Sequence, residues 1–98
     1  MKPYFLPLKK EYYLKFKEGT QNCEIRPAGH HGWNEKNIYA GRQLKLSCGY
    51  GNNDRHCRYI RTVIVGSSDF AFMGVPQWHI DAVESIYGKR DRWLVAYV

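Results

Sequence analysis

The sequence contains no apolar run near the ~18 residues that a membrane-spanning helix requires. The segment before Leu8 has two prolines and too short an apolar stretch for a secretory signal peptide. Internal repeats, linkers and low-complexity tracts are also missing. We therefore expect one domain over residues 1–98, monomeric and cytoplasmic, with no membrane association.

Cysteine is scarce, and Cys23, Cys48 and Cys57 form an odd set, which favours reduced thiols over a disulfide framework. No Cys-x-x-Cys or His-x-x-x-His pair is present. Structural zinc sites usually show such pairs, so we expect no metal and no cofactor. A cysteine nucleophile, for example Cys23 with His30 or His31, requires a lowered thiol pKa and an imidazole within hydrogen-bond reach, and the sequence indicates neither.

Acidic residues are few relative to basic ones. The 9 Asp and Glu face 15 Lys and Arg, which gives a net charge of +6 and a pI of ≈ 9.3. This balance favours anionic partners such as RNA, although a basic protein with no nucleic-acid role has the same composition. Aromatic residues make up 15% of the chain. That is more than a small core needs, so we expect some rings at the surface or in a cleft.

Hydrophobic periodicity and breakers predict a mixed α+β domain with a mainly antiparallel sheet. Apolar or alternating residues predict strands at 5–8, 22–26, 43–48, 58–66 and 93–98. Amphipathic spacing predicts helices at 10–17, ended by Gly19, and from Pro76 to Tyr87. Pro7 indicates an edge or a bulge for the first strand, and residues 27–40 read as a loop rich in Gly, His and Asn.

The strand after the first helix carries an acid and a base in alternation, Glu24-Ile25-Arg26. Because side chains repeat with period two along a strand, Glu24 and Arg26 point to one face and Ile25 to the other. Such a pair can grip a polar planar ligand. The alternative is an exposed salt bridge on a strand face, worth ~0–1 kcal/mol.

The same segment resembles the Gly-x-Lys-x-x-Glu-x-Arg signature of ASCH domains, with Gly19, Glu24 and Arg26 matching and Gln21 in the lysine position. The order of later elements is closest to small ASCH proteins of phages and prophages. Those elements are Leu6-Pro7-Leu8-Lys9, Tyr12-Tyr13, Trp33, Gly41-Arg42 and Gly49-Tyr50-Gly51. The similarity covers most of the first 60 residues, and the rest matches in outline.

The resemblance implies a PUA-like β-barrel of about five to six mainly antiparallel strands with two short flanking helices. It also implies that Glu24 and Arg26 lie in a central groove that binds RNA or a modified nucleotide. Glu24 would accept hydrogen bonds from a base, while Arg26 would hold a phosphate or stack on a ring. The expected ligand-binding residues are Gly19, Gln21, Glu24, Arg26, Trp33, Arg42, Tyr50 and Arg55.

Gln21 weakens the enzyme hypothesis. The family's acetylcytidine amidohydrolases and a ribonuclease rely on the motif lysine, and glutamine can neither act as a base nor supply a cation. The amidohydrolases also have a threonine where this chain has Glu24. Lys9 or Lys36 could supply the missing cation, which leaves Glu24 and Lys9 as the catalytic candidates. We expect binding without turnover, with a hydrolase as the alternative and a phage protein-interaction module as a further one.

Rings and cations also interleave across the middle of the chain, a mixture that suits stacking of unpaired bases and electrostatic contacts to phosphates. The residues concerned are Trp33, Tyr39 and Tyr50 with Arg42, Arg55, Arg58 and Arg61. The alternative is that Tyr39 and Tyr59 pack inside while the arginines are only solvated. Gly49, Gly51 and Asn52 could bring backbone N–H groups to a phosphate, although hairpin turns use the same residues.

Overall fold

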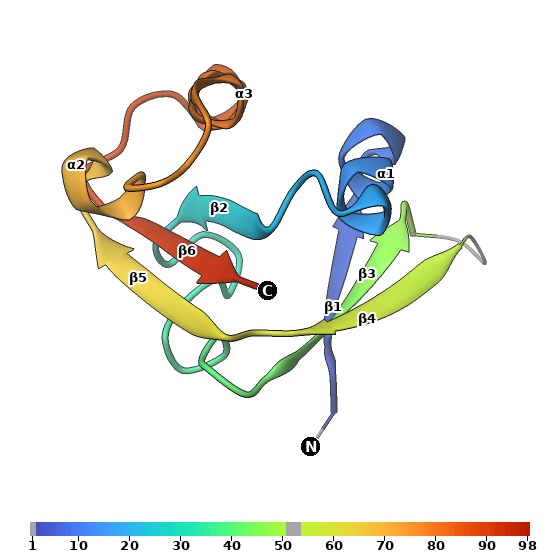
Figure 1. Ribbon diagram of the computed structural model, residues 1–98. Helices are drawn as coiled ribbons and strands as arrows, with labels where there is room; N and C mark the ends of the chain where they lie inside the picture. The colour runs from blue at the N-terminus through green and yellow to red at the C-terminus, as the bar shows by residue number, and fades with distance from the viewer. Residues whose placement is uncertain (1, 51–53) are drawn as a thin grey trace.

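The computed structural model describes residues 2–50 and 54–98. They form an α+β fold with six strands and three helices. One three-stranded sheet has the order β1-β3-β4, with β1 at Tyr4–Leu8, β3 at Gln43–Cys48 and β4 at Arg55–Tyr59. The other has the order β2-β6-β5, with β2 at Cys23–Pro27, β6 at Trp93–Tyr97 and β5 at Thr62–Gly66. In Figure 1 the two sheets stand side by side, each with its own helical cover.

Most strand pairs are antiparallel, as the sequence predicts. The exception is β1, which runs parallel to β3, whereas β3–β4, β2–β6 and β5–β6 are antiparallel. The strand that contains Pro7 lies at the edge of its sheet, where a residue without an N–H does least harm to the ladder. The predicted edge position of this strand is therefore confirmed.

The prediction of one strand over residues 58–66 is wrong, because the chain changes sheets in its middle. The N–H of Ile60 still donates to Arg42, beside β3, but the N–H of Arg61 donates to Tyr97 at the end of β6. The segment therefore divides into β4 and β5, which belong to different sheets. A run of β-branched and aromatic residues has the same appearance on both sides of such a corner.

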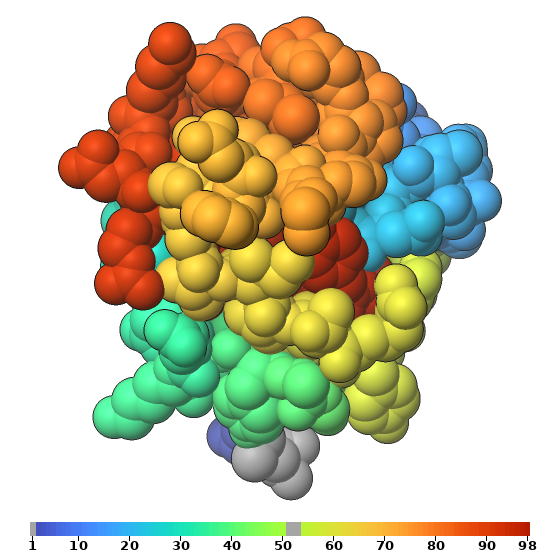
Figure 2. Space-filling model, turned by 60° about the vertical axis from the view of Figure 1, so that its left-hand side comes forward, coloured from blue at the N-terminus to red at the C-terminus, as the bar shows by residue number. Residues whose placement is uncertain are grey.

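The helices at both ends of the chain agree with the periodicity. Helix α1 (Lys10–Glu18) buries Tyr13 and Phe16 and ends at Gly19, whose φ of 82° lies in the left-handed region. Helix α3 (Gln77–Tyr87) follows Pro76. A third helix, α2 (Ser68–Ala71), was not expected, because four residues are too short to show a helical period. It packs against β5 and β6, and Figure 2 shows it on the surface directly above β5.

The closed barrel that the resemblance implies is not confirmed. Strands β1 and β2 are the outer strands of their sheets, and no ladder joins them within the described residues. Two apolar clusters fill the interior, one with Leu6, Leu44 and Leu94 and the other with Ile25 and Trp93. No helix of residues 2–50 and 54–98 is both long and apolar enough to span a bilayer.

Candidate functional site

A pocket of about 180 Å³ lies where the unpaired edges of the two sheets come together. The end of β1, the start of α1, β2 and one face of α3 form its walls. The polar lining residues are Lys9, Gln21, Glu24, Arg26 and His79, and the rings are Tyr12 and Tyr87. Aliphatic side chains of α3 complete the wall. The pocket is therefore a product of four elements that meet only in the folded chain.

Glu24 and Arg26 do point into the same hollow. Their side chains are 9% and 20% exposed, and Glu24 Oε2 lies 3.7 Å from Arg26 Nη2. The N–H of Ile25 donates to Glu24 Oε1 at 3.2 Å. Burial raises the pKa of the Glu24 carboxyl, while the charge of Arg26 and the Ile25 N–H oppose that rise. The pair is thus a partly desolvated one in a pocket, rather than an exposed salt bridge.

Three residues that line this pocket each have a buried side-chain atom with no hydrogen-bond partner within the described residues: Gln21 Oε1, Glu24 Oε2 and Arg26 Nε. The amide of Gln21 is otherwise held in place, since its Nε2 donates to the Cys23 carbonyl at 3.1 Å. Burying a polar atom without a partner costs about 1–3 kcal/mol, so such atoms are few in folded proteins. Two acceptors and one donor in one hollow are what a small polar ligand would satisfy.

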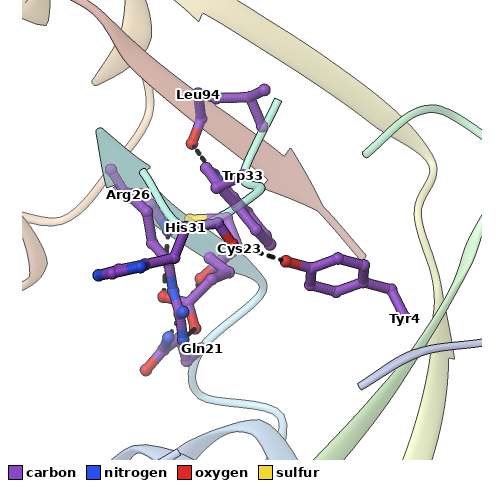
Figure 3. Close-up of polar contacts among 9 residues, drawn as sticks. Tyr4, Gln21, Cys23, Arg26, His31, Trp33 and Leu94 are labelled. Atoms are coloured by element: carbon purple, nitrogen blue, oxygen red, sulfur yellow. Dashed lines mark hydrogen bonds and ion pairs between the residues drawn. The ribbon is translucent and has the colours of Figure 1, made fainter. Parts of the chain in front are cut away.

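Trp33 lies against Arg26, outside the pocket. Its ring is 1% exposed, its Nε1 donates to the Leu94 carbonyl at 2.8 Å, and the Arg26 guanidinium lies 5.5 Å from the ring centroid. Figure 3 shows the indole between Leu94 and Tyr4, with Arg26 alongside. Trp33 is not among the residues that line the pocket, so in this structure it presents no stacking face to a ligand.

The other predicted site residues are distributed over the surface. Gly19 caps α1, and the Arg42 guanidinium donates to the carbonyls of Asn37 and Lys2. Tyr50 and Arg55 lie near Phe5, on the other sheet. None of these four predicted residues lines the pocket.

Of the two lysines considered as substitutes for the motif lysine, Lys9 lines the pocket and Lys36 does not. Lys36 lies in the loop after Trp33, where its backbone N–H donates to Asn34. Gly51 and Asn52, considered for a phosphate contact, lie outside the described residues.

The sequence did not indicate the α3 side of the pocket. His79 is 3% exposed and faces Cys23, so the partner of this thiol is neither His30 nor His31. Burial raises the pKa of Cys23 to about 12 and lowers the pKa of His79 to about 4. Both shifts oppose a thiolate–imidazolium pair, so Cys23 lacks the activation that a nucleophile needs. Among the described residues no group of three His, Cys, Asp or Glu side chains could hold a metal ion.

Two histidines and two arginines lie around Tyr87. The His30 ring lies 5.3 Å from the Tyr87 ring and 4.2 Å from His31. Burial lowers the pKa of His30, and the charges of His31, Arg26 and Arg90 lower it further. Arg90 also donates to the Tyr87 carbonyl at 2.9 Å. A ligand that carried an anionic group out of the pocket at this end would meet the guanidinium groups of Arg26 and Arg90.

No protein-family model matches the chain, and no curated protein or solved structure matches it.

Proposed function

We propose that this protein is an ASCH-like domain, with a PUA-like barrel open between β1 and β2, that binds RNA or a modified nucleotide through one base in the pocket. The observation that carries the proposal is that Gln21, Glu24 and Arg26 line one hollow and each has a buried polar atom without a hydrogen bond. Such groups give specificity because a ligand that lacks the matching groups leaves them buried and unpaired.

The size of the pocket favours one ring system over an extended strand. Its volume of about 180 Å³ is below the ~300–1,000 Å³ typical of pockets for drug-sized ligands. Tyr12 and Tyr87 supply aromatic walls on which a base can pack. The oxygens of Gln21 and Glu24 accept from the amino or imino groups of the base, and Arg26 Nε donates to a ring carbonyl. Guanine offers two donors and one acceptor on its Watson–Crick edge, so guanosine is the unmodified nucleoside we expect to bind best.

The cations beside Tyr87 extend the site to the sugar-phosphate. Arg26, Arg90 and His31 lie close enough to His30 to lower its pKa. A guanidinium pairs well with phosphate oxygens in two-point geometry. We therefore expect a nucleoside 5′-monophosphate to bind more tightly than the nucleoside, with an advantage that shrinks as salt rises.

The test is an NMR titration of the isotopically labelled protein with a panel of nucleosides, modified pyrimidine nucleosides and their monophosphates. Binding should shift the amide resonances of β2 and α3. Glu24→Gln and Arg26→Gln should each weaken binding about tenfold or more, since a hydrogen bond to a charged group contributes ~1.5–3 kcal/mol. Glu18→Gln is the matched control, because Glu18 is exposed at the end of α1. If no member of the panel binds at low salt, the proposal is lost.

A hydrolase is the second candidate, favoured by the presence of Lys9 in the pocket. The raised pKa of Glu24 lets its carboxyl keep a proton to higher pH than an ordinary glutamate, which suits general acid catalysis. In this hypothesis Lys9 supplies the cation that Gln21 cannot, and the bond cleaved is an amide on a modified pyrimidine or an RNA linkage. Turnover that disappears in Lys9→Ala and in Glu24→Gln would support it.

A further inference from the structure

We propose that the outer face of the β1-β3-β4 sheet is a second binding surface, separate from the pocket, for single-stranded nucleic acid. This surface, called the sheet platform below, consists of Phe5, Lys45, Arg55 and Tyr59, with Tyr50 beside it. It accounts for two residues, Tyr50 and Arg55, that the sequence singled out for ligand binding and that the pocket does not use.

The strand register places these side chains on one face. Phe5 is the partner of Lys45 in the β1–β3 ladder, and Cys57 is the partner of Lys45 in the β3–β4 ladder. Arg55 and Tyr59 flank Cys57 at a distance of two residues, so they share its face. The opposite face is the buried one, because it carries Leu6, Leu44 and Leu46.

Helix α1 covers only that opposite face. The Tyr13 ring lies 5.1 Å from the His56 ring, and Arg58 donates to the Phe16 carbonyl at 3.3 Å. His56 and Arg58 alternate with the platform residues along β4, which leaves Tyr59 on the solvent side. The aromatic residues of the platform are accordingly exposed, with Phe5 at 38%, Tyr50 at 83% and Tyr59 at 64%.

The spacing of these rings suits successive unpaired bases. Phe5 and Tyr50 are 6.4 Å apart between ring centroids. Tyr59 lies two strands away from Phe5, which at about 4.8 Å per strand is roughly 10 Å across the sheet. Aromatic residues at such positions on an open sheet stack two or three bases in known RNA-binding folds. Because every base has an aromatic face, such stacking is tolerant of sequence.

Charge selects nucleic acid over a second protein as the occupant. Strands β1, β3 and β4 contain no Asp or Glu, whereas β3 and β4 contribute Lys45 and Arg55 to this face. The Arg55 guanidinium lies 5.3 Å from the Phe5 ring centroid, so cation and ring are side by side. The carboxylate next along the chain, Asp54, is paired with Lys17. Phosphates between stacked bases would therefore meet the side chains of Lys45 and Arg55.

The test uses fluorescence anisotropy of labelled ten-nucleotide RNA and DNA, with U10 as the first probe, in 50 mM and 200 mM KCl. Tyr59→Ala and Phe5→Ala should each weaken U10 binding about fivefold or more, and affinity should fall steeply with salt. Tyr59→Phe should bind like the unmodified protein because it keeps the ring. Phe70→Ala is the matched control, because Phe70 is 68% exposed and lies on α2, away from the platform.

The proposed binding at the platform and the proposed binding in the pocket can be refuted independently. Tyr59→Ala should leave nucleoside binding in the NMR titration unchanged. Glu24→Gln should weaken nucleoside binding about tenfold or more and leave the stacking contribution to U10 binding in place. The platform is refuted if Tyr59→Ala and Phe5→Ala bind U10 as the unmodified protein does, or if U10 does not bind at 50 mM KCl. It is also refuted if sedimentation shows a dimer that Tyr59→Ala dissociates, because the face would then serve a second copy.

Discussion

The thiol of Cys23 lies 3.8 Å from Nδ1 of His79, and both groups are neutral at physiological pH. Burial is the main cause on each side: it raises the pKa of Cys23 to about 12 and lowers the pKa of His79 to about 4. The pair joins β2 to α3, two of the four elements that form the walls of the pocket. Protonation of His79 or ionisation of Cys23 would therefore place a buried charge between two elements that form the pocket.

The first prediction is that stability falls on acidification between pH 6.5 and pH 4. In this window the unfolded chain binds a proton at His79 and the folded chain does not, so the free energy of unfolding decreases as pH falls. The pKa of His79 is about 4 when folded, which corresponds to at most about 3 kcal/mol. Urea unfolding at pH 7.5, 5.5 and 4 measures the change.

His79→Asn should reduce the fall in the free energy of unfolding between pH 6.5 and pH 4, because asparagine does not titrate. Its side-chain amide can occupy a position near that of Nδ1. Part of the slope should remain, since burial also lowers the pKa values of His30 and His56. A slope that is the same in His79→Asn and in the unmodified protein would show that His79 is not the titrating group.

The second prediction is that Gly19 matters to stability and not to ligand binding. A Cβ at this position would meet nothing within 4 Å, but the φ of +82° is one that side chains rarely adopt. Gly19→Ala should therefore cost about 1–2 kcal/mol through backbone strain and leave the nucleoside affinity of the folded protein unchanged. Gly19→Asn should cost less, because asparagine tolerates the left-handed region. Loss of affinity in a fully folded Gly19→Ala protein would instead give Gly19 a role at the ligand.

The third prediction concerns Trp33→Phe. The substitution keeps a ring beneath Arg26 but removes the donor to the Leu94 carbonyl, which is then buried without its partner. The free energy of unfolding should drop by about 1–3 kcal/mol, measured by urea denaturation. Nucleoside affinity should change less than twofold under conditions where the protein is folded. A large loss of affinity with unchanged stability would mean that a ligand reaches the indole after all.

The fourth prediction is a test of turnover with Gln21→Lys. The new ammonium would lie beside Glu24, where it replaces the amide that donates to the Cys23 carbonyl. If the pocket is hydrolytic, this variant should release product from an acylated cytidine or RNA faster than the unmodified protein, measured by chromatography. Gln21→Met, which is similar in size but uncharged, is the control. Absence of product in all three proteins would argue strongly against an enzyme.

Much of the local structure follows from short-range pattern. Helix α1 could be predicted because its apolar side chains recur at helical spacing and Gly19 ends it. The β4–β5 corner could not, since what divides it is the transfer of the Arg61 N–H to the Tyr97 carbonyl, 36 residues further along. Helix α2 escaped because a single turn has no period to detect. Short-range sequence patterns therefore predicted most of the helices and strands, but few of the pairings between them.

By itself, the sequence determined that Glu24 and Arg26 share a face, because alternation along a strand is a local property of the backbone. Only the tertiary structure decided that this face is a pocket, since its other walls include the end of β1 and α3, which begins 50 residues after β2 ends. Tertiary packing also decided that Trp33 is buried, with its indole N–H donating to the Leu94 carbonyl. It likewise placed Tyr50 and Arg55 beside Phe5 of the other sheet, away from the pocket. Residue type limits what a side chain can do, but long-range packing decides what it meets.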